Sequence, residues 1–430
     1  MIGVALFIYI LYVICTKNSE TVRKRLFDIT LLVCLFMFSS KDYIVQMPLY
    51  IYPLLLSIGF SAGITITVQK RVAKTAICLI VCLLVGIALL AMGFISGNYL
   101  LLNESNTDVM NISGQLFAPS MNFTVFKHFV FYLVDIIFIV LNTDLLSDNE
   151  HIKKLLANIV KIFRALFVLI IFEWAFVNIN GGFNDRQIMG IIFSLPQMNQ
   201  IINWMTWGSY SVALGFTERS EMVIVLIYYL IFLKQESYST WDFLWLIISY
   251  IAIYCTGSSS ALTVGILAAV IYLALTRLSS KHILFGGILL VTSIYLYIHY
   301  GNVFGSKTQD FLSAYRSSKN YGSAFWRAQS IEYAVKAFKQ NPLFGVGIGT
   351  VYTHGMLFEV LTNIGLIGTF FSIQLLYYAV GSFSISKKNA ALIAMVIVVS
   401  YGSLMVENFT SPLMLLIFII FEYERRMFNE

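Results

Sequence analysis

Residues 327–368 read RAQSIEYAVKAFKQNPLFGVGIGTVYTHGMLFEVLTNIGLIG, and this stretch carries more information about the fold than any other. Its first dozen residues favour a helix, which Asn341-Pro342 should end because proline lacks an N–H and clashes with the preceding turn. Three glycines at a spacing of two then predict a turn where backbones pass closely. They are Gly345, Gly347 and Gly349. His354 follows at the entrance to an apolar segment, so the stretch predicts an extramembrane helix, a glycine turn and a membrane helix.

The rest of the chain is strongly apolar. Of 430 residues, 59% are hydrophobic and 12% are charged, and the mean hydropathy is +0.81. A soluble domain is typically about one quarter charged, so lipid is the expected solvent. Membrane helices satisfy their own backbone hydrogen bonds. The sequence therefore predicts an all-α, polytopic integral membrane helical bundle that forms a single transmembrane domain over residues 1–430, without a cleavable signal peptide.

Thirteen apolar segments are candidate helices, and the basic residues between them give their orientation. The segments are roughly 2–16, 27–40, 48–69, 75–96, 126–143, 155–178, 221–233, 241–256, 261–276, 283–299, 356–380, 389–406 and 412–424. With the N-terminus outside and the C-terminus inside, every short basic connection, including the one with Arg23, Lys24 and Arg25, faces the cytoplasm. Twelve crossings with the N-terminus inside are the alternative if the first segment does not span.

Three outer connections are long, at 97–125, 179–220 and 300–355, and the last two carry arginines next to points of membrane entry. These arginines are Arg186, Arg219, Arg316 and Arg327. A guanidinium is a permanent charge whose planar fork grips phosphate through two hydrogen bonds. The last two loops are therefore expected to form an active-site vestibule for a diphosphate group. Loop solubility or contact with anionic lipid is the alternative explanation of each arginine.

One histidine and several acids are further candidates. His354 is the only histidine in the long outer loops, and it could accept a proton or donate to an oxyanion. The other histidines, which we expect to anchor span ends at the interface, are His128, His151, His282 and His299. Acids in or near the spans are costly in lipid and often functional. They are Asp135, Glu173, Glu359 and Glu407. Glu173 and Glu407 could contact a sugar or pair with an outer arginine for structure.

Familiar catalytic motifs are absent. The sequence contains no DxD pair, no HExxH, no Walker A and no nucleotide-binding glycine motif after a strand. The five cysteines lie in or next to apolar runs, and no histidine or acid accompanies Cys78 and Cys82, which are one helical turn apart. This pattern favours packing over metal or disulfide chemistry. No metal and no cofactor are expected.

The segment PLFGVGIGT followed by HGMLFEVLTNIGLIG closely resembles the signature of the bacterial O-antigen polymerase and O-antigen ligase superfamily. Arg327 matches the arginine of the signature, 342–349 its turn, His354 its histidine and 365–368 its helix motif. Arg186 with FSLPQMN, and CTGSSSAL at 255–262, are weaker matches. The chain departs from the pattern at Gly355, where Asn is frequent, at Ser259, where Arg or Lys is frequent, and at Gln197-Met198.

This resemblance implies a GT-C-like fold of about twelve or thirteen helices and a metal-independent glycosyl transfer at the outer face of the bacterial inner membrane. The donor would be a glycan on undecaprenyl diphosphate. His354 and Arg327 would be catalytic. The residues expected to contact the diphosphate or glycan are Arg186, Arg219, Arg316, Glu173, Glu407 and Gly347. The implied partners are lipid-linked oligosaccharide, the bilayer, a chain-length regulator and a flippase, and no nucleic acid.

Among members of such a family, a polymerase of repeat units is favoured, because the chain is rich in Phe and Tyr and has short inner loops. A ligase that transfers the glycan to lipid A–core is the first alternative. A flippase of lipid-linked sugar is a second, although the cations cluster at one face rather than in the membrane core. A scaffold subunit of an envelope assembly is a third.

Overall fold

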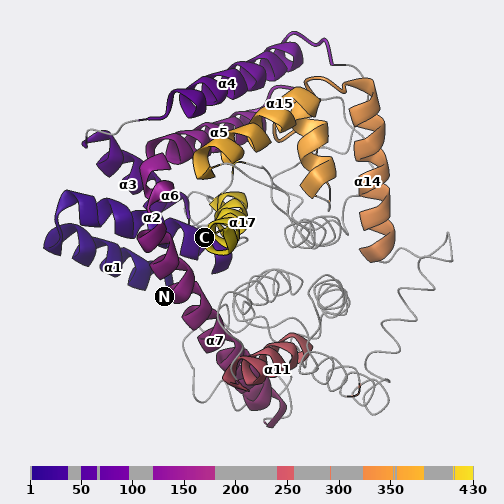
Figure 1. Cartoon of the computed structure of the whole chain (residues 1–430). Helices are drawn as coiled ribbons and strands as arrows, with labels where there is room; N and C mark the ends of the chain where they lie inside the picture. Colours follow the sequence, from indigo (N-terminus) through magenta and orange to yellow (C-terminus); the bar gives the residue numbers. More distant parts are fainter. Residues whose placement is uncertain are drawn as a thin grey trace.

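The computed structural model describes residues 2–36, 50–64, 68–95, 120–179, 240–255, 291, 323–351, 353, 356–381, 410 and 412–429. Within these ranges the regular structure is helical and no strand occurs (Figure 1), which confirms the all-α prediction for this part of the chain. Three helical segments are long and apolar enough to cross a membrane. They are Lys70–Ala91, Asn149–Phe172 and Leu357–Val380. The protein is therefore helical and suited to membrane insertion.

The described helices follow the predicted segments closely. In chain order they are α1 (Ile2–Thr16), α2 (Ser19–Phe36), α3 (Ile51–Ala62), α4 (Lys70–Ala91), α5 (Phe123–Leu141), α6 (Thr143–Ser147), α7 (Asn149–Ile179), α11 (Thr240–Cys255), α14 (Ser323–Gln340), α15 (Met356–Val380) and α17 (Pro412–Asn429). Of the other predicted segments, 221–233, 261–276 and 389–406 lie outside the described residues, and only residue 291 of 283–299 is described.

Several predicted boundaries are shifted, and two segments differ most. The segment 48–69 was expected to be one helix, but α3 ends at Ala62 and Gly63 caps it. The segment 27–40 was expected to begin a helix, but α2 begins at Ser19, where the Asn18 side chain accepts the N–H of Thr21 at 2.9 Å. This N-cap explains why the helix starts inside the polar sequence that precedes the apolar run.

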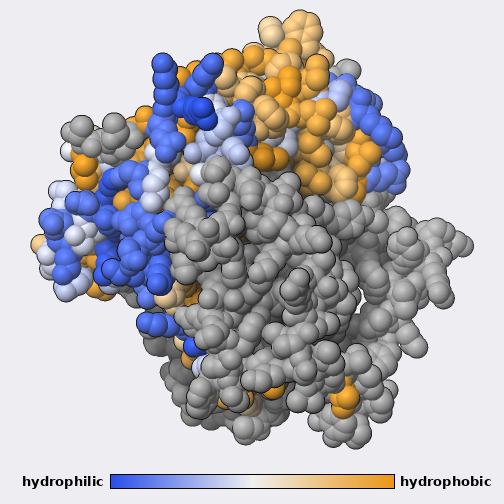
Figure 2. All heavy atoms as spheres, viewed as in Figure 1, coloured by the Kyte–Doolittle hydropathy of each residue, from blue (hydrophilic) through white to orange (hydrophobic). Residues whose placement is uncertain are grey.

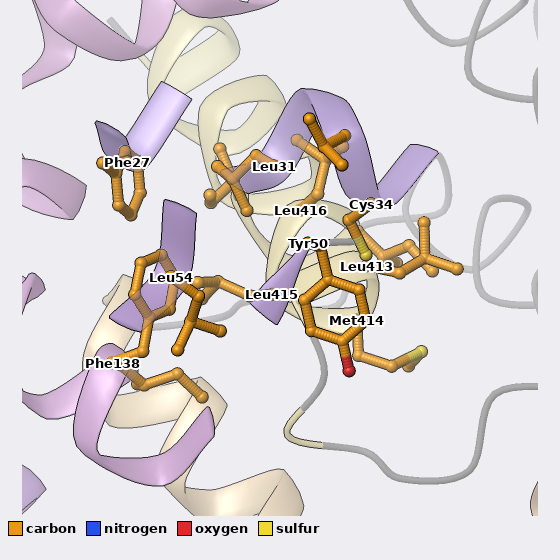
Figure 3. Close-up of a cluster of buried hydrophobic side chains, with 14 of the residues drawn as sticks. Phe27, Leu31, Cys34, Tyr50, Leu54, Phe138, Leu413, Met414, Leu415 and Leu416 are labelled. Atoms are coloured by element: carbon orange, nitrogen blue, oxygen red, sulfur yellow. The ribbon is translucent and has the colours of Figure 1, made fainter. Parts of the chain in front are cut away.

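One hydrophobic core joins the first and last thirds of the chain. Phe27 and Leu31 of α2 and Leu54 of α3 are fully buried against Phe138 of α5 and Leu415 of α17 (Figure 3). The rings of Phe27 and Phe138 stack with their centroids 5.5 Å apart. Helix α17 packs against α2, α7 and α15, so the C-terminal helix fills the centre of the N-terminal bundle (Figure 1).

A buried arginine ties this bundle together. Arg23 was expected in an inner connection, but it lies within α2 and only 2% of it is exposed. Its Nε donates to Ser61 Oγ at 3.0 Å, its Nη1 to Asp144 Oδ2 at 2.7 Å and its Nη2 to Leu141 O at 2.8 Å. Because an unpaired buried charge would be strongly unfavourable, these partners on α3, α5 and α6 fix the position of α2.

The exposed faces differ between helices (Figure 2). Helix α4 exposes Ile77, Val81 and Leu84, whose spacing places them on one face, and α15 exposes Leu366 and Phe370. Such apolar faces suit contact with lipid tails. Helix α14, along the right edge of the view, instead exposes polar side chains. They are Glu332, Lys336, Lys339 and Gln340. That α14 lies outside the membrane stays a prediction.

Candidate functional site

Helix α14 precedes the glycine turn and carries Arg327. It begins at Ser323, earlier than the sequence indicated, and ends at Gln340 as predicted. The N–H of Asn341 donates to Ala337 O at 3.2 Å and to Phe338 O at 3.1 Å, and Pro342 then prevents another helical turn. Arg327 is therefore part of a regular helix and not of an irregular loop.

The exposed side of α14 carries an ion pair between two residues that are one helical turn apart. Lys336 Nζ lies 2.7 Å from Glu332 Oε1, and this contact raises the pKa of Lys336. The order, with the acid four residues before the base, is the favourable one in a helix. Both side chains are more than 60% exposed, so the pair lies on the exposed face of α14 and contributes little to the stability of the fold.

The three glycines form the turn that their spacing predicted, and all three have positive φ, at 72°, 103° and 67°. A Cβ on Gly345 would lie 2.5 Å from Thr362 O of α15, and one on Gly349 would lie 2.7 Å from the His128 ring of α5. A Cβ on Gly347 would lie 2.8 Å from Leu90 Cδ2 of α4. Only glycine fits where the turn touches three helices at once.

Helix α15 is interrupted where the turn meets it. Gly365 has φ 68° and ψ −175°, a conformation almost restricted to glycine, and the helix bends there (Figure 1). The turn satisfies backbone groups on both sides of the break. The hydrogen bonds are Val346 N to Thr362 O (2.8 Å), Gly347 N to Asn363 O (3.1 Å), Leu366 N to Pro342 O (2.9 Å) and Ile367 N to Leu343 O (3.2 Å). The predicted segment 356–380 is thus two half-helices that meet at Gly365, and the turn forms hydrogen bonds to both of them.

A side-chain amide extends this contact beyond the turn. Asn363 is 3% exposed, and its Nδ2 donates to Val351 O at 2.9 Å while its Oδ1 accepts the Val351 N–H, also at 2.9 Å. The amide therefore bonds both backbone groups of one residue, as a neighbouring strand would. This arrangement fixes the chain three residues before His354.

Residue 353 is held from two further directions. The N–H of Thr353 donates to Glu359 Oε2 at 3.3 Å, and its Oγ1 lies 3.4 Å from Ser330 Oγ of α14. Ser330, Thr353 and Glu359 are all buried. Nearby, Thr362 Oγ1 of α15 donates to Ala334 O of α14 at 3.0 Å. Polar groups between α14 and α15 thus gather next to the start of α15.

Some predicted site residues lie in described helices and others do not. Arg327 lies on α14, three residues before Ser330, and Glu173 lies on α7. Gly347 is buried in the turn, where its N–H bonds to Asn363 O. The remaining candidates lie outside the described residues. They are His354, Arg186, Arg219, Arg316 and Glu407. The structure therefore links the α14 turn that follows Arg327 to the residue that directly precedes His354.

Two residues near the turn have roles that sequence reasoning missed. His128, expected at the membrane interface, is 6% exposed and packs against Gly349 and the edge of the Phe131 ring. Asn363 is not among the residues that the sequence predicts to be functional. Its signal was a polar amide in an apolar segment, four residues after Glu359 and therefore on the same helical face.

Neither a search for metal-binding groups nor comparisons with known proteins assign a function to this site. In the parts of the chain that the structure describes, no three His, Cys, Asp or Glu side chains are grouped so as to hold a metal ion. A comparison with protein-family models found no match, and a comparison with curated proteins found no match either.

Proposed function

We propose that this protein is a glycosyltransferase that joins undecaprenyl-diphosphate-linked oligosaccharide repeat units into O-antigen or capsular polysaccharide. Its site faces the outer side of the bacterial inner membrane. The proposal is supported by apolar helices of membrane-spanning length and by the resemblance of residues 327–368 to the polymerase and ligase superfamily. It is also supported by the way in which α14, the glycine turn and α15 pack as one unit.

The observation that carries most weight is the contact between Ser330 and Thr353. Arg327 precedes Ser330 by three residues, which is just under one helical turn, and His354 directly follows Thr353. Two residues that the signature separates by 26 intervening positions therefore flank a single tertiary contact. This arrangement favours a shared site for a cation and a proton acceptor.

In the proposed reaction, an acceptor hydroxyl on one lipid-linked unit attacks the anomeric carbon of the donor glycan. The carbon–oxygen bond to the undecaprenyl diphosphate breaks, and the acceptor proton passes to the His354 imidazole. Arg327, with Arg186, Arg219 and Arg316, neutralises the charge that develops on the leaving diphosphate. Fixed guanidinium groups would then do the work that a divalent ion does in many sugar transferases.

The test is incubation of the purified full-length protein in lipid nanodiscs with undecaprenyl-diphosphate-linked oligosaccharide. A ladder of products that differ by one repeat unit, unchanged by EDTA, would support a metal-independent polymerase. Transfer only to added lipid A–core would identify a ligase instead. Transbilayer movement of the lipid without synthesis would identify a flippase. If the protein catalyses neither synthesis nor movement, a scaffold role remains. Abolition of the ladder by EDTA would refute metal independence.

A further inference from the structure

The contact network around Glu359 takes no part in the proposed reaction. Glu359 is a carboxylic acid at the start of an apolar helix, yet it is only 5% exposed. An acid in such a place is costly unless its interactions compensate for the loss of water. One of its oxygens accepts the N–H of Thr353, the residue before His354. This bond, 3.3 Å long, connects the start of α15 to the backbone directly before His354.

The chain on either side of that bond is held as well. Asn363, one turn further along α15, bonds both backbone groups of Val351. Ser330 of α14 contacts the hydroxyl of Thr353. Residues 351 and 353 are thus attached to α15 by two side chains and to α14 by one. These three side chains hold the described chain up to residue 353, which directly precedes His354.

We infer that Glu359 is a positioning residue, which holds the backbone at Thr353, directly before His354, through its bond to the Thr353 N–H. The inference rests on the proposed function in so far as it concerns catalysis, because His354 is the proton acceptor there. Glu359 acts through geometry and takes no proton from the substrate. A shift of about 1 Å in a reacting group can lower a rate by about 100-fold, so this bond matters for turnover rather than for substrate affinity.

Three variants separate this role from others. Glu359→Ala removes the acceptor, whereas Glu359→Gln keeps an oxygen that can accept the same N–H and loses only the charge. Glu332→Ala is the matched control, because Glu332 is an exposed glutamate of α14 that pairs with Lys336 on the same helix. We expect Glu359→Ala to lower kcat for chain extension by about 100-fold with KM within about threefold. Glu359→Gln should retain kcat within about threefold, and Glu332→Ala should match the wild type.

A second readout does not depend on the activity. Diethyl pyrocarbonate modifies histidine, and mass spectrometry reports the rate at His354 in each variant. Glu359→Ala should change that rate by more than about threefold, while Glu359→Gln and Glu332→Ala should not. Equal loss of kcat in the Ala and Gln variants would overturn the geometric role, and so would an unchanged modification rate in Glu359→Ala. A wild type that forms no ladder would refute the polymerase, and the modification rates would still decide the role of Glu359.

Discussion

Replacement of Gly365 by alanine tests the junction between the glycine turn and α15 most directly. An added Cβ would lie 2.3 Å from Leu343 O, 2.5 Å from Leu343 C and 2.6 Å from Gly345 N. All three atoms belong to the backbone, so no side-chain rotation can relieve the overlap. The turn must move away from α15, and the hydrogen bonds that join them must lengthen or break.

The structure gives the approximate size of the effect. Forcing alanine into a conformation close to φ 68° and ψ −175° costs about 1–3 kcal/mol. Loss of the two bonds from Leu366 and Ile367 to the turn adds about 1 kcal/mol each. Gly365→Ala should therefore destabilise the protein by about 3–5 kcal/mol.

Two other glycines provide controls. Gly93 has φ 71° in the turn that ends α4, where its N–H bonds to Leu90 O, but a Cβ there would meet nothing within 4 Å. Gly93→Ala should therefore cost only the conformational term, about 1–2 kcal/mol. Gly59 lies inside α3 with open space around it, and Gly59→Ala should stabilise the helix by about 0.5–1 kcal/mol.

Unfolding of the purified protein by SDS in mixed micelles, followed by far-UV circular dichroism, ranks the three variants. The expected order of stability is Gly59→Ala, wild type, Gly93→Ala and then Gly365→Ala. If Gly365→Ala is no less stable than Gly93→Ala, the close approach of Leu343 to the break does not exist. The account of the two half-helices would then fail with it.

Three further changes test other parts of the site. Arg327→Lys keeps the charge but loses the planar fork, and we expect it to abolish the product ladder as Arg327→Ala does, at unchanged protein level; full activity of the Lys variant would exclude two-pronged diphosphate binding. Asn363→Asp keeps the shape but sets an oxygen against Val351 O, and it should cost about 1–3 kcal/mol in the same SDS titration; wild-type stability would contradict the amide contact. The pKa of Asp148 is lowered, mainly because its carboxylate accepts the backbone N–H of His151 at the start of α7. The stability that Asp148 contributes is complete above its unfolded pKa of about 3.9 and is lost as the pH falls through the lower pKa of the folded state. Asp148→Asn should therefore make the stability of the protein depend less on pH at acidic pH.

The sequence was sufficient to predict those features that local chemistry determines. Asn341-Pro342 ends α14 where expected, because proline cannot continue a helix in any surroundings. The glycine spacing at 345–349 predicted a tight backbone approach, and each of these glycines has positive φ. Continuous apolar runs predicted α4, α7 and α15 as helices of membrane-spanning length.

Features that depend on distant residues could not be predicted. The break at Gly365 is stabilised by Pro342 O and Leu343 O, which lie more than twenty positions earlier, whereas the local sequence reads as a continuous apolar helix. Arg23 looked like a loop cation because its partner Asp144 is 121 residues away.

The shared hydrogen bonds of the turn and α15 have a consequence for biogenesis. At the interruption, the N–H groups of Leu366 and Ile367 and the carbonyl groups of Thr362 and Asn363 bond to the turn. An unsatisfied peptide group in hydrocarbon costs several kcal/mol. A ribosome-bound chain that released residues 356–380 into the bilayer alone would expose these groups to lipid. Insertion of the second half of this helix should therefore be energetically coupled to the docking of residues 342–347.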